Sequence, residues 1–361
     1  MEYIIFLTYR CNLRCSYCFA SNVVFHNESD YSLSSQKTNQ IIEFIKRDIF
    51  KRRSEDNSIV FFGGEPTLVP GIINEIINNT KGLGLRYSIY TNGLLLDLLP
   101  QHILDQLNSI LVAIDGDKKT HELYKPVGSF DKIINNVSKV RNNFNGELIA
   151  RITMEEETDI FWSVTNLLNE FDFVHWQIVN KPYFNDPLLL IKRYEKNIKK
   201  LYDYWINALS HGNIYNIIPF NEIMTYILSN QKVENSFWCG CGKSVMAIDI
   251  NGKVYQCDEY INRPNSCIGS IDDQDIILKY SPHSEICTVC RNCSISSICL
   301  GRCKKSLETL PLDNLQVYCS LTKILINQLC SNANLVEDII KHNNWKTDRS
   351  PHAKYKTEIL P

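Results

Sequence analysis

The sequence lacks any hydrophobic run long enough to cross a membrane. Its most apolar runs, Tyr3–Leu7 and Ile110–Ile114, are a few residues long, whereas a membrane-spanning helix needs about 20 residues. The N-terminus also lacks the basic residues and the long apolar core of a signal peptide. The sequence therefore predicts a cytoplasmic protein with no membrane partner.

The chain also has little excess charge. Its 38 Lys and Arg residues nearly balance 40 Asp and Glu residues, so no overall basic field favours nucleic acid as a partner. No two of the 8 histidines stand at metal-ligand spacing, and no repeat or low-complexity segment is evident. With 44% apolar and 22% charged residues, the composition excludes disordered and fibrous classes.

Cysteine is the residue type in excess, with 14 in 361 residues. Because cytosolic thiols are kept reduced, structural disulfides are not expected. Several cysteines stand at tight spacings, and this pattern indicates metal ligands.

The first two-thirds of the chain alternates predicted strands and helices. Strands are predicted at 3–8, 58–62, 86–91, 110–114, 147–153 and 173–179, and helices at 34–53, 70–79, 97–107, 130–140, 159–170 and 188–209. Ser129 is the expected N-cap of the fourth helix. This alternation predicts an α/β fold with a parallel sheet. We expect a partial (β/α)6 TIM-like barrel with functional residues at the carboxyl ends of its strands.

The pattern changes after residue 215. We expect a barrel domain at 1–215, a linker at 216–236, a small cysteine-rich domain at 237–329, and a C-terminal helix and tail at 330–361. The cysteine-rich region has few predicted elements, so metal would replace a hydrophobic core there.

The first cysteine group follows the first predicted strand directly. Cys11, Cys15 and Cys18 place three thiolates on one short loop. Three thiolates suit three corners of a cubane 4Fe–4S cluster and leave one iron open for a cofactor or substrate. A zinc site is the alternative, but structural zinc takes four protein ligands and no fourth lies nearby in the sequence.

This loop, with Tyr17 before its last cysteine, resembles the signature of the radical S-adenosylmethionine (SAM) superfamily. Further motifs match in order at the strand ends: Gly63-Gly64-Glu65-Pro66, Thr91-Asn92-Gly93, Ile114-Asp115-Gly116 and Arg151. The resemblance implies that the residues binding SAM are Tyr17, Gly63, Gly64, Glu65, Asn92, Asp115 and Arg151. Ala113 departs from it, because many relatives have a serine there.

Each of these motifs also has an ordinary structural interpretation. A Gly-Gly pair after a strand is typical of a turn, and Asp115 suits a helix N-cap. Arg151 has Glu147 and Glu155 as alternative surface partners.

The C-terminal cysteines resemble the SPASM domain of peptide-modifying radical SAM enzymes, which carries two auxiliary 4Fe–4S clusters. The resemblance assigns Cys290, Cys293, Cys299 and Cys319 to a distal cluster. It assigns Cys239, Cys241, Cys257 and Cys303 to a nearer cluster, for which Cys267 and Cys287 are alternative ligands. Cys330 has no motif role. A pair of zinc ribbons is the alternative for the whole region.

Asp258 is the candidate catalytic residue. It directly follows Cys257, and in anaerobic sulfatase-maturing enzymes the aspartate of the matching Cys-Asp pair accepts the proton of the oxidised side chain. The structural alternative is a carboxylate that caps a turn.

The resemblance implies a radical SAM enzyme that abstracts hydrogen from a peptide or protein side chain and oxidises it, forming a thioether, a carbon–carbon crosslink or formylglycine. Its cofactors would be SAM and three 4Fe–4S clusters. Its partners would be the peptide, an electron donor such as flavodoxin or ferredoxin, and a separate leader-binding protein, since the chain begins at the first predicted strand. The alternatives are a small-molecule substrate and a non-catalytic, zinc-stabilised binding module.

Overall fold

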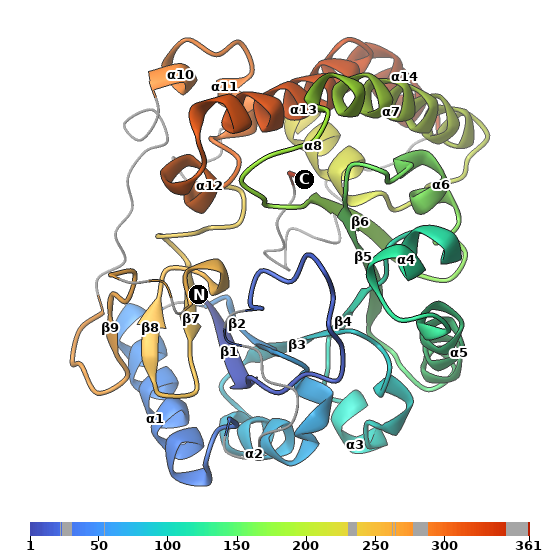
Figure 1. Ribbon diagram of the computed structural model, residues 1–361. Coiled ribbons are helices and arrows are strands. Elements are labelled where there is room, and N and C mark those ends of the chain that lie inside the picture. Colours follow the sequence, from blue (N-terminus) through green and yellow to red (C-terminus); the bar gives the residue numbers. More distant parts are fainter. Residues whose placement is uncertain are drawn as a thin grey trace. The chain divides into compact units, whose positions relative to one another are not determined.

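The computed structural model describes residues 1–21, 23, 31–53, 55–229, 237–261, 263, 265–276, 288–343 and 360–361. The chain divides into two compact units, and Figure 1 labels their helices and strands. The first comprises Met1–Ile114, His121–Ile149 and Cys241–Tyr280, and the second comprises Asp115–Thr120, Ala150–Gly240 and Ser281–Pro361. Cys287, most of the predicted linker's second half and most of the C-terminal tail lie outside the described residues. The predicted domain boundaries stay a prediction.

The first unit is built on a mainly parallel sheet. Its strands are β1 (Glu2–Thr8), β2 (Asn57–Gly63), β3 (Leu85–Thr91), β4 (Ser109–Ala113), β7 (Val245–Ile248), β8 (Lys253–Tyr255) and β9 (Gly269–Ser270). They lie in the order β4-β3-β2-β1-β7-β8-β9. Strands β1 to β4 pair parallel with one another and β7 pairs parallel with β1, whereas β8 pairs antiparallel with both β7 and β9. A late segment of the chain thus returns to pair with the first strand.

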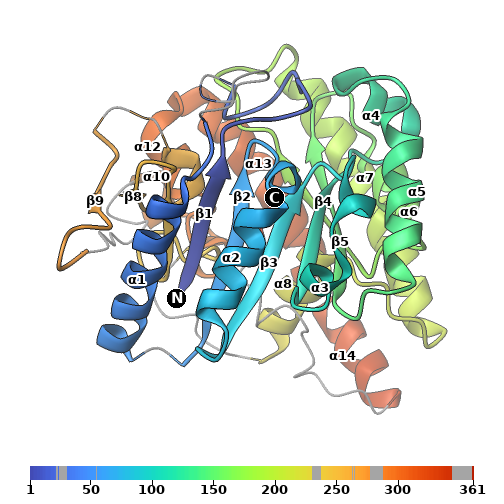
Figure 2. The ribbon, with the colours of Figure 1, turned by 90° about the horizontal axis from the view of Figure 1, so that it is seen from below.

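Helices cover one face of this sheet. The elements are α1 (Ser35–Arg52), α2 (Pro70–Thr80), α3 (Gln101–Leu104), α5 (Ser129–Arg141) and the 3-10 turns η1 (Pro66–Leu68), η2 (Leu96–Leu98) and η3 (Asp258–Tyr260). Figure 2 shows α1 and α2 on the same side of β1, β2 and β3. The helical spacing of Ile41, Ile42 and Ile45 gives α1 its buried face, and Ser34 caps the helix by accepting from the Lys37 N–H.

Two elements are shared between the units. Strand β5 (Glu147–Met154) and helix α4 (Lys118–Tyr124) each have residues in both. The elements of the second unit alone are β6 (Phe173–Ile178), α6 (Ile160–Thr165), α7 (Pro187–Ser210), α8 (Ile218–Ser229), α10 (Thr288–Arg291), α11 (Ser296–Cys299), α12 (Lys304–Thr309), α13 (Leu312–Cys330) and α14 (Ala333–His342).

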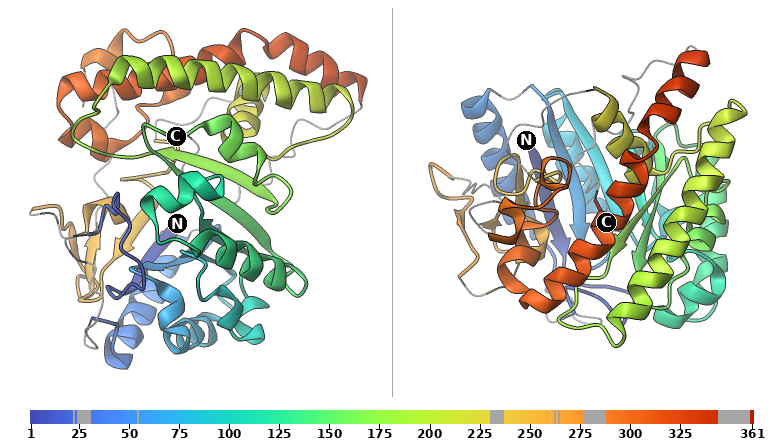
Figure 3. Two further views of the ribbon diagram at one scale, coloured as in Figure 1. Left: turned by 45° about the vertical axis from the view of Figure 1, so that its right-hand side comes forward. Right: turned by 90° about the horizontal axis from the view of Figure 1, so that it is seen from above.

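The second unit packs its long helices around aromatic side chains. Helices α7 and α13 lie side by side (Figure 3). Trp176, Tyr194 and Phe220 are buried between elements of this unit, and the Trp176 indole N–H donates to the Tyr194 hydroxyl at 3.3 Å. Helices α11 and α13, which carry Cys299 and Cys319, pack against the helices of this core.

The six predicted strands are confirmed, with bounds shifted by one residue at most ends. The helix predicted at 97–107 is wrong: a 3-10 turn precedes α3, because Pro100 lacks an N–H and disfavours helix at Leu99. The helix predicted at 159–170 ends at Thr165 and continues as turns. Gly128, not Ser129, is the N-cap of α5. No described helix is long and apolar enough to cross a membrane.

Candidate active site

The first cysteine group lies on the loop that leaves β1. Cys11, Cys15 and Cys18 are all half-buried. The loop folds on itself, because the Cys18 N–H donates to the Cys15 carbonyl at 3.2 Å and the Leu13 N–H points at the Cys11 sulfur at 3.4 Å. The sequence prediction that these cysteines share one compact loop is confirmed.

The electrostatics of this loop suit a bound cation. Burial raises the pKa of the Cys11 thiol to about 12, the Leu13 N–H opposes this, and the charges of Glu65, Cys15 and Cys18 raise it further. Burial also raises the pKa of Cys18, with a contribution from Glu259. Three thiolates crowded in a buried loop are stabilised when positive iron replaces their protons. The loop therefore fits an iron–sulfur cluster.

Glu65 joins the ends of β2 and β3. Its carboxylate is fully buried and accepts the Thr67 N–H at 3.0 Å and the Thr67 hydroxyl at 2.6 Å. It also accepts the Thr91 hydroxyl and the Asn92 N–H, both at 2.7 Å. Burial raises the pKa of Glu65, and these hydrogen bonds oppose it. Both carboxylate oxygens of Glu65 thus accept hydrogen bonds, and these bonds hold the ends of β2 and β3 together.

Asn92 connects the end of β3 to the cysteine loop. Its side-chain amide donates to the Asn12 side chain at 2.7 Å and lies 3.9 Å from the Cys11 sulfur. The backbone hydrogen bond to Glu65 holds Asn92 in place. Asn12, which the sequence analysis did not single out, is therefore part of the contact between β3 and the loop.

Gly63 and Gly64 allow the end of β2 to lie directly against the start of the loop. A Cβ atom on Gly63 would stand 2.3 Å from the Thr8 carbonyl oxygen, and one on Gly64 would stand 2.3 Å from the Arg10 carbonyl oxygen. The Gly64 N–H donates to Thr8 at 2.8 Å. Only glycine permits this approach.

Tyr17 lies beside two residues from the end of α4. Its ring centroid is 5.9 Å from that of Tyr124, and the Lys125 ammonium is 5.9 Å from the Tyr17 centroid. Lys125 is buried and donates to the Ala113 carbonyl at 2.8 Å. No local sequence pattern indicates Lys125, because its position depends on how α4 packs.

Asp115 and Arg151 belong to the second unit, whereas the other predicted SAM-binding residues belong to the first. The Asp115 carboxylate is buried and accepts the Thr153 N–H at 2.9 Å. Gly116 packs tightly on Ser163, since a Cβ atom would meet the serine hydroxyl at 2.2 Å. Arg151 is half-buried on β5.

Asp258 lies in the first unit with the three-cysteine loop. It is the first residue of η3 and is half-buried. The carboxylate of its neighbour, Glu259, acts electrostatically on Cys18. Of the cysteines predicted for the nearer cluster, Cys241 and Cys257 belong to the first unit, and Cys239 and Cys303 to the second.

The four cysteines predicted for the distal cluster come together. Cys290, Cys293, Cys299 and Cys319 all line one pocket of the second unit. Arg302, Cys303 and Tyr318 line the same pocket. Burial raises the pKa of Cys299 to about 12; the Gly301 N–H and Arg302 oppose this, whereas Cys319 and Cys293 add to it.

Cys267 and Cys330, which have no part in this pocket's lining, are exposed. Among the described residues, no three His, Cys, Asp or Glu side chains stand close enough to share a single metal ion.

The model of the radical SAM superfamily matches residues 5–165. The chain is 28% identical to a cysteine-type anaerobic sulfatase-maturating enzyme of Clostridium novyi over 330 residues, covering 82% of this chain and 86% of that one. It is 31% identical to a probable GTP 3',8-cyclase of Saccharolobus islandicus over 276 residues, covering 70% of this chain and 80% of that one.

Among solved structures, the chain resembles native anSMEcpe with bound AdoMet and Cp18Cys peptide. The TM-score is 0.70 at 18% identity, with 93% of this chain and 99% of that chain covered. This likeness shows that the two proteins share a fold, and it confirms the predicted α/β class. The chain therefore belongs to the radical SAM superfamily and is an enzyme of that class, with SAM and a 4Fe–4S cluster as cofactors.

Proposed function

We propose that this enzyme oxidatively modifies a side chain of a peptide or protein. The relative from Clostridium novyi is named as a sulfatase-maturating enzyme and matches most of both chains. The solved structure of similar fold contains a bound peptide. Sulfatase maturation is itself the oxidation of a protein side chain, so a substrate of this class suits the chain.

In this proposal Cys11, Cys15 and Cys18 hold the first cluster. The residues Tyr17, Gly63, Gly64, Glu65, Asn92, Asp115 and Arg151 form the SAM site. When bound, SAM and the cluster together supply a carbon-centred radical that abstracts a hydrogen atom from the substrate. The chain's contribution is to fix the loop, which the contacts of Glu65 and Asn92 support.

The observation that carries the proposal is the gathering of the distal cysteines in one pocket beside a buried cation. Four thiolates suit a closed 4Fe–4S cluster, and an enzyme that oxidises its substrate needs a route for electrons to leave. We therefore assign Cys290, Cys293, Cys299 and Cys319 to an auxiliary cluster. The assignment of Cys239, Cys241, Cys257 and Cys303 to a second one rests on the resemblance.

Asp258 is proposed as the base that takes the proton lost by the oxidised side chain. Its half-buried position in the same unit as the three-cysteine loop supports this role. A flavodoxin or ferredoxin would exchange electrons with the clusters, and a separate protein would bind the leader of a ribosomal peptide substrate.

The test uses anaerobically purified enzyme with reductant, SAM and a set of peptides that carry cysteine or serine at a central position. We expect 5′-deoxyadenosine together with a peptide whose mass has fallen by the hydrogen lost. Release of 5′-deoxyadenosine without any change in every peptide tested would contradict a peptide substrate.

A nucleotide is the second candidate substrate, because the chain is 31% identical to a probable GTP 3',8-cyclase. The same incubation with GTP in place of peptide distinguishes the two. Consumption of GTP with stoichiometric 5′-deoxyadenosine would favour the small-molecule function.

A further inference from the structure

Three cations are buried next to the distal cysteine pocket. The exposed fractions of Arg302, Lys304 and Lys305 are 7%, 7% and 5%. Buried Lys and Arg side chains are rare unless a negative group compensates them. Lys304 has such a partner in Glu308, and Arg302 donates to an oxygen of Pro361, the last residue of the sequence.

The backbone places Arg302 in the pocket lining. Leu300, Gly301 and Arg302 all adopt left-handed conformations, with φ of 53°, 83° and 57°. Non-glycine residues adopt this conformation at a cost. The tight turn that results joins Cys299 to Cys303 and is closed by a hydrogen bond of 3.1 Å from the Arg302 N–H to the Cys299 carbonyl.

The guanidinium is held on two sides. Its central carbon lies 4.7 Å from the ring centroid of Tyr318, and its Nε donates to the backbone oxygen of Pro361 at 2.6 Å. The planar guanidinium suits both contacts, because it stacks on aromatic rings and keeps its charge at every accessible pH.

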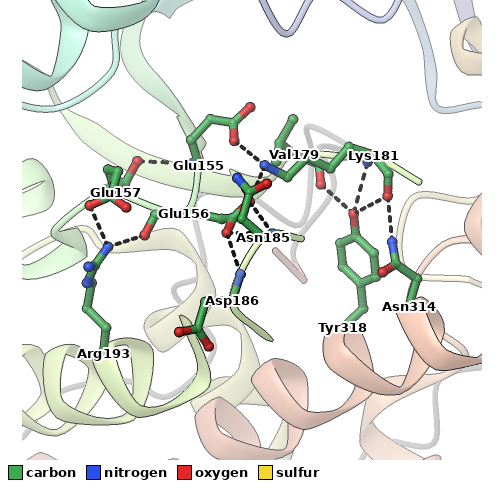
Figure 4. Close-up of polar contacts among 11 residues, drawn as sticks. Glu155, Glu156, Glu157, Val179, Lys181, Asn185, Asp186, Arg193, Asn314 and Tyr318 are labelled. Carbon is green, nitrogen blue, oxygen red and sulfur yellow. Dashed lines mark hydrogen bonds and ion pairs between the residues drawn. The ribbon is translucent and has the colours of Figure 1, made fainter. Parts of the chain in front are cut away.

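Tyr318 is itself fixed, as Figure 4 shows. Its hydroxyl donates to the Val179 carbonyl and accepts from the Lys181 N–H at 3.1 Å. Asn314, one turn earlier on α13, donates to the Lys181 carbonyl at 2.7 Å. These hydrogen bonds join the loop after β6 to α13, the helix that carries Cys319. They also hold the Tyr318 ring in its position against Arg302.

A buried positive charge beside a cluster affects its two redox states differently. Reduction adds one electron, and the negative charge interacts strongly with a nearby cation because the interior has a low dielectric constant. Net charge and local hydrogen bonds are known to set the potentials of iron–sulfur clusters. Arg302 lines the pocket that Cys290, Cys293, Cys299 and Cys319 also line, so a cluster held by these thiolates would lie beside its positive charge.

We propose that Arg302 raises the reduction potential of the distal cluster and so makes it the acceptor of the electron that substrate oxidation releases. This inference rests on the proposed function, which assigns a cluster to the distal cysteines. The carbon-centred radical would take one hydrogen atom from a substrate carbon, and the substrate radical would then give one electron to the auxiliary clusters and one proton to the proposed base. Arg302 is thus a positioning residue that acts through the cluster and does not touch the substrate.

The test is an EPR-monitored redox titration of reconstituted full-length protein in which Cys11, Cys15 and Cys18 are replaced by Ala. Adding Cys290→Ala and Cys293→Ala identifies the distal signal as the one that disappears. In R302Q we expect the ratio of reduced to oxidised distal cluster to fall about tenfold at a fixed potential, which corresponds to a midpoint about 59 mV more negative.

Two variants separate charge from packing. R302K keeps the charge, so its midpoint should stay closer to the parent than that of R302Q. Arg193→Gln is the matched control, because Arg193 pairs with Glu157 and does not line the pocket; its midpoint should be unchanged.

An R302Q protein with the distal signal present and the parent midpoint would overturn the proposal. If R302Q binds no distal cluster, Tyr318→Leu tests the proposal instead. This variant removes the ring against which the Arg302 guanidinium stacks, and it keeps the charge of Arg302. A more negative midpoint in Tyr318→Leu supports the proposal, and an unchanged one overturns it. Absence of any auxiliary-cluster signal in the parent would instead refute the proposed function, and the tuning role with it.

Discussion

At the residue scale, the site depends on close backbone contacts that tolerate no side chain. Gly64 lies so near the Arg10 carbonyl that the end of β2 and the cysteine loop share one fixed geometry. Glu65 then links this point to β3 through Thr91 and Asn92. The sequence motif at these positions therefore has a structural task, whatever further contact it makes with SAM.

Gly64→Ala should disturb the cysteine loop. The added methyl group meets backbone, which cannot rotate away as a flexible side chain would, so we expect a loss of about 1–3 kcal/mol in the free energy of unfolding and weaker cluster absorbance. Chemical denaturation and the visible spectrum measure both. Gly71→Ala is the control, because nothing lies within 4 Å of its Cβ position; an equal loss in both variants would refute the argument.

Asp258→Ala should separate cofactor cleavage from product formation. Asp258 lies outside the three-cysteine loop, so reductive cleavage of SAM should continue, whereas the substrate loses its proton acceptor. The assay compares 5′-deoxyadenosine with modified peptide. Asp272→Ala, at an exposed position of the same unit, should leave both unchanged. Full product formation by Asp258→Ala would remove this residue from the active site.

At the element scale, the loop between β6 and α7 depends on ion pairs around Lys181. Its ammonium contacts Glu155 at 2.8 Å and Glu156 at 2.7 Å, and all three side chains are largely buried (Figure 4). Burial works against both charges. Even so, hydrogen bonds from Lys181, Asn185 and Asp186 lower the pKa of Glu156 overall, and hydrogen bonds to the two glutamates raise the pKa of Lys181.

Lys181→Met should cost about 1.5–3 kcal/mol of unfolding free energy at neutral pH. Because the folded pKa of Glu156 is lowered, its stabilisation is full above the unfolded value near 4.5 and is lost as the pH falls through the folded pKa. The difference between wild type and variant should therefore shrink in acid. It should also shrink in strong alkali, as the pH rises through the raised pKa of Lys181.

Lys199→Met is the matched control for this prediction. Lys199 pairs with Asp203 at 3.1 Å on the exposed side of α7, and such pairs contribute about 1 kcal/mol at most. Urea denaturation at several pH values gives the comparison. If Lys181→Met costs no more than Lys199→Met, the ion pairs do not hold this loop.

Element prediction succeeded where the local pattern decides the structure. The short apolar run at Ile110–Ile114 gave a buried strand, because its length suits a strand and is too short for a helix. The helix expected at 97–107 failed because one residue, Pro100, outweighs the apolar pattern around it. Helix α13 is not predicted by the cysteine-rich pattern, although Leu321 and Leu325 lie four residues apart and are both buried on it.

At the scale of the whole molecule, the compact units do not follow the chain. Cys241–Tyr280 belongs to the first unit because β7 pairs with β1, a long-range pairing that no local pattern indicates. The four cysteines that the SPASM resemblance assigns to the distal cluster line one pocket, but Cys303, which it assigns to the nearer cluster, lines that pocket as well. Arg302 was not predicted, because its placement depends on Tyr318 and on the left-handed turn after Cys299.

Family membership also decides between the alternatives left open by the sequence. The match to the radical SAM superfamily makes the chain an enzyme, so the non-catalytic zinc module is wrong as an account of the whole protein. Zinc in the C-terminal region, in place of the proposed auxiliary clusters, is a separate question that metal analysis answers.

The most direct test of the central claim is the iron and zinc content of anaerobically reconstituted protein. The account predicts about twelve irons per chain and no zinc, falling to about eight when Cys11, Cys15 and Cys18 are all replaced by Ala, with loss of SAM cleavage. About four irons in the wild type, with zinc in the C-terminal cysteines, would contradict the auxiliary clusters on which the proposed oxidation depends.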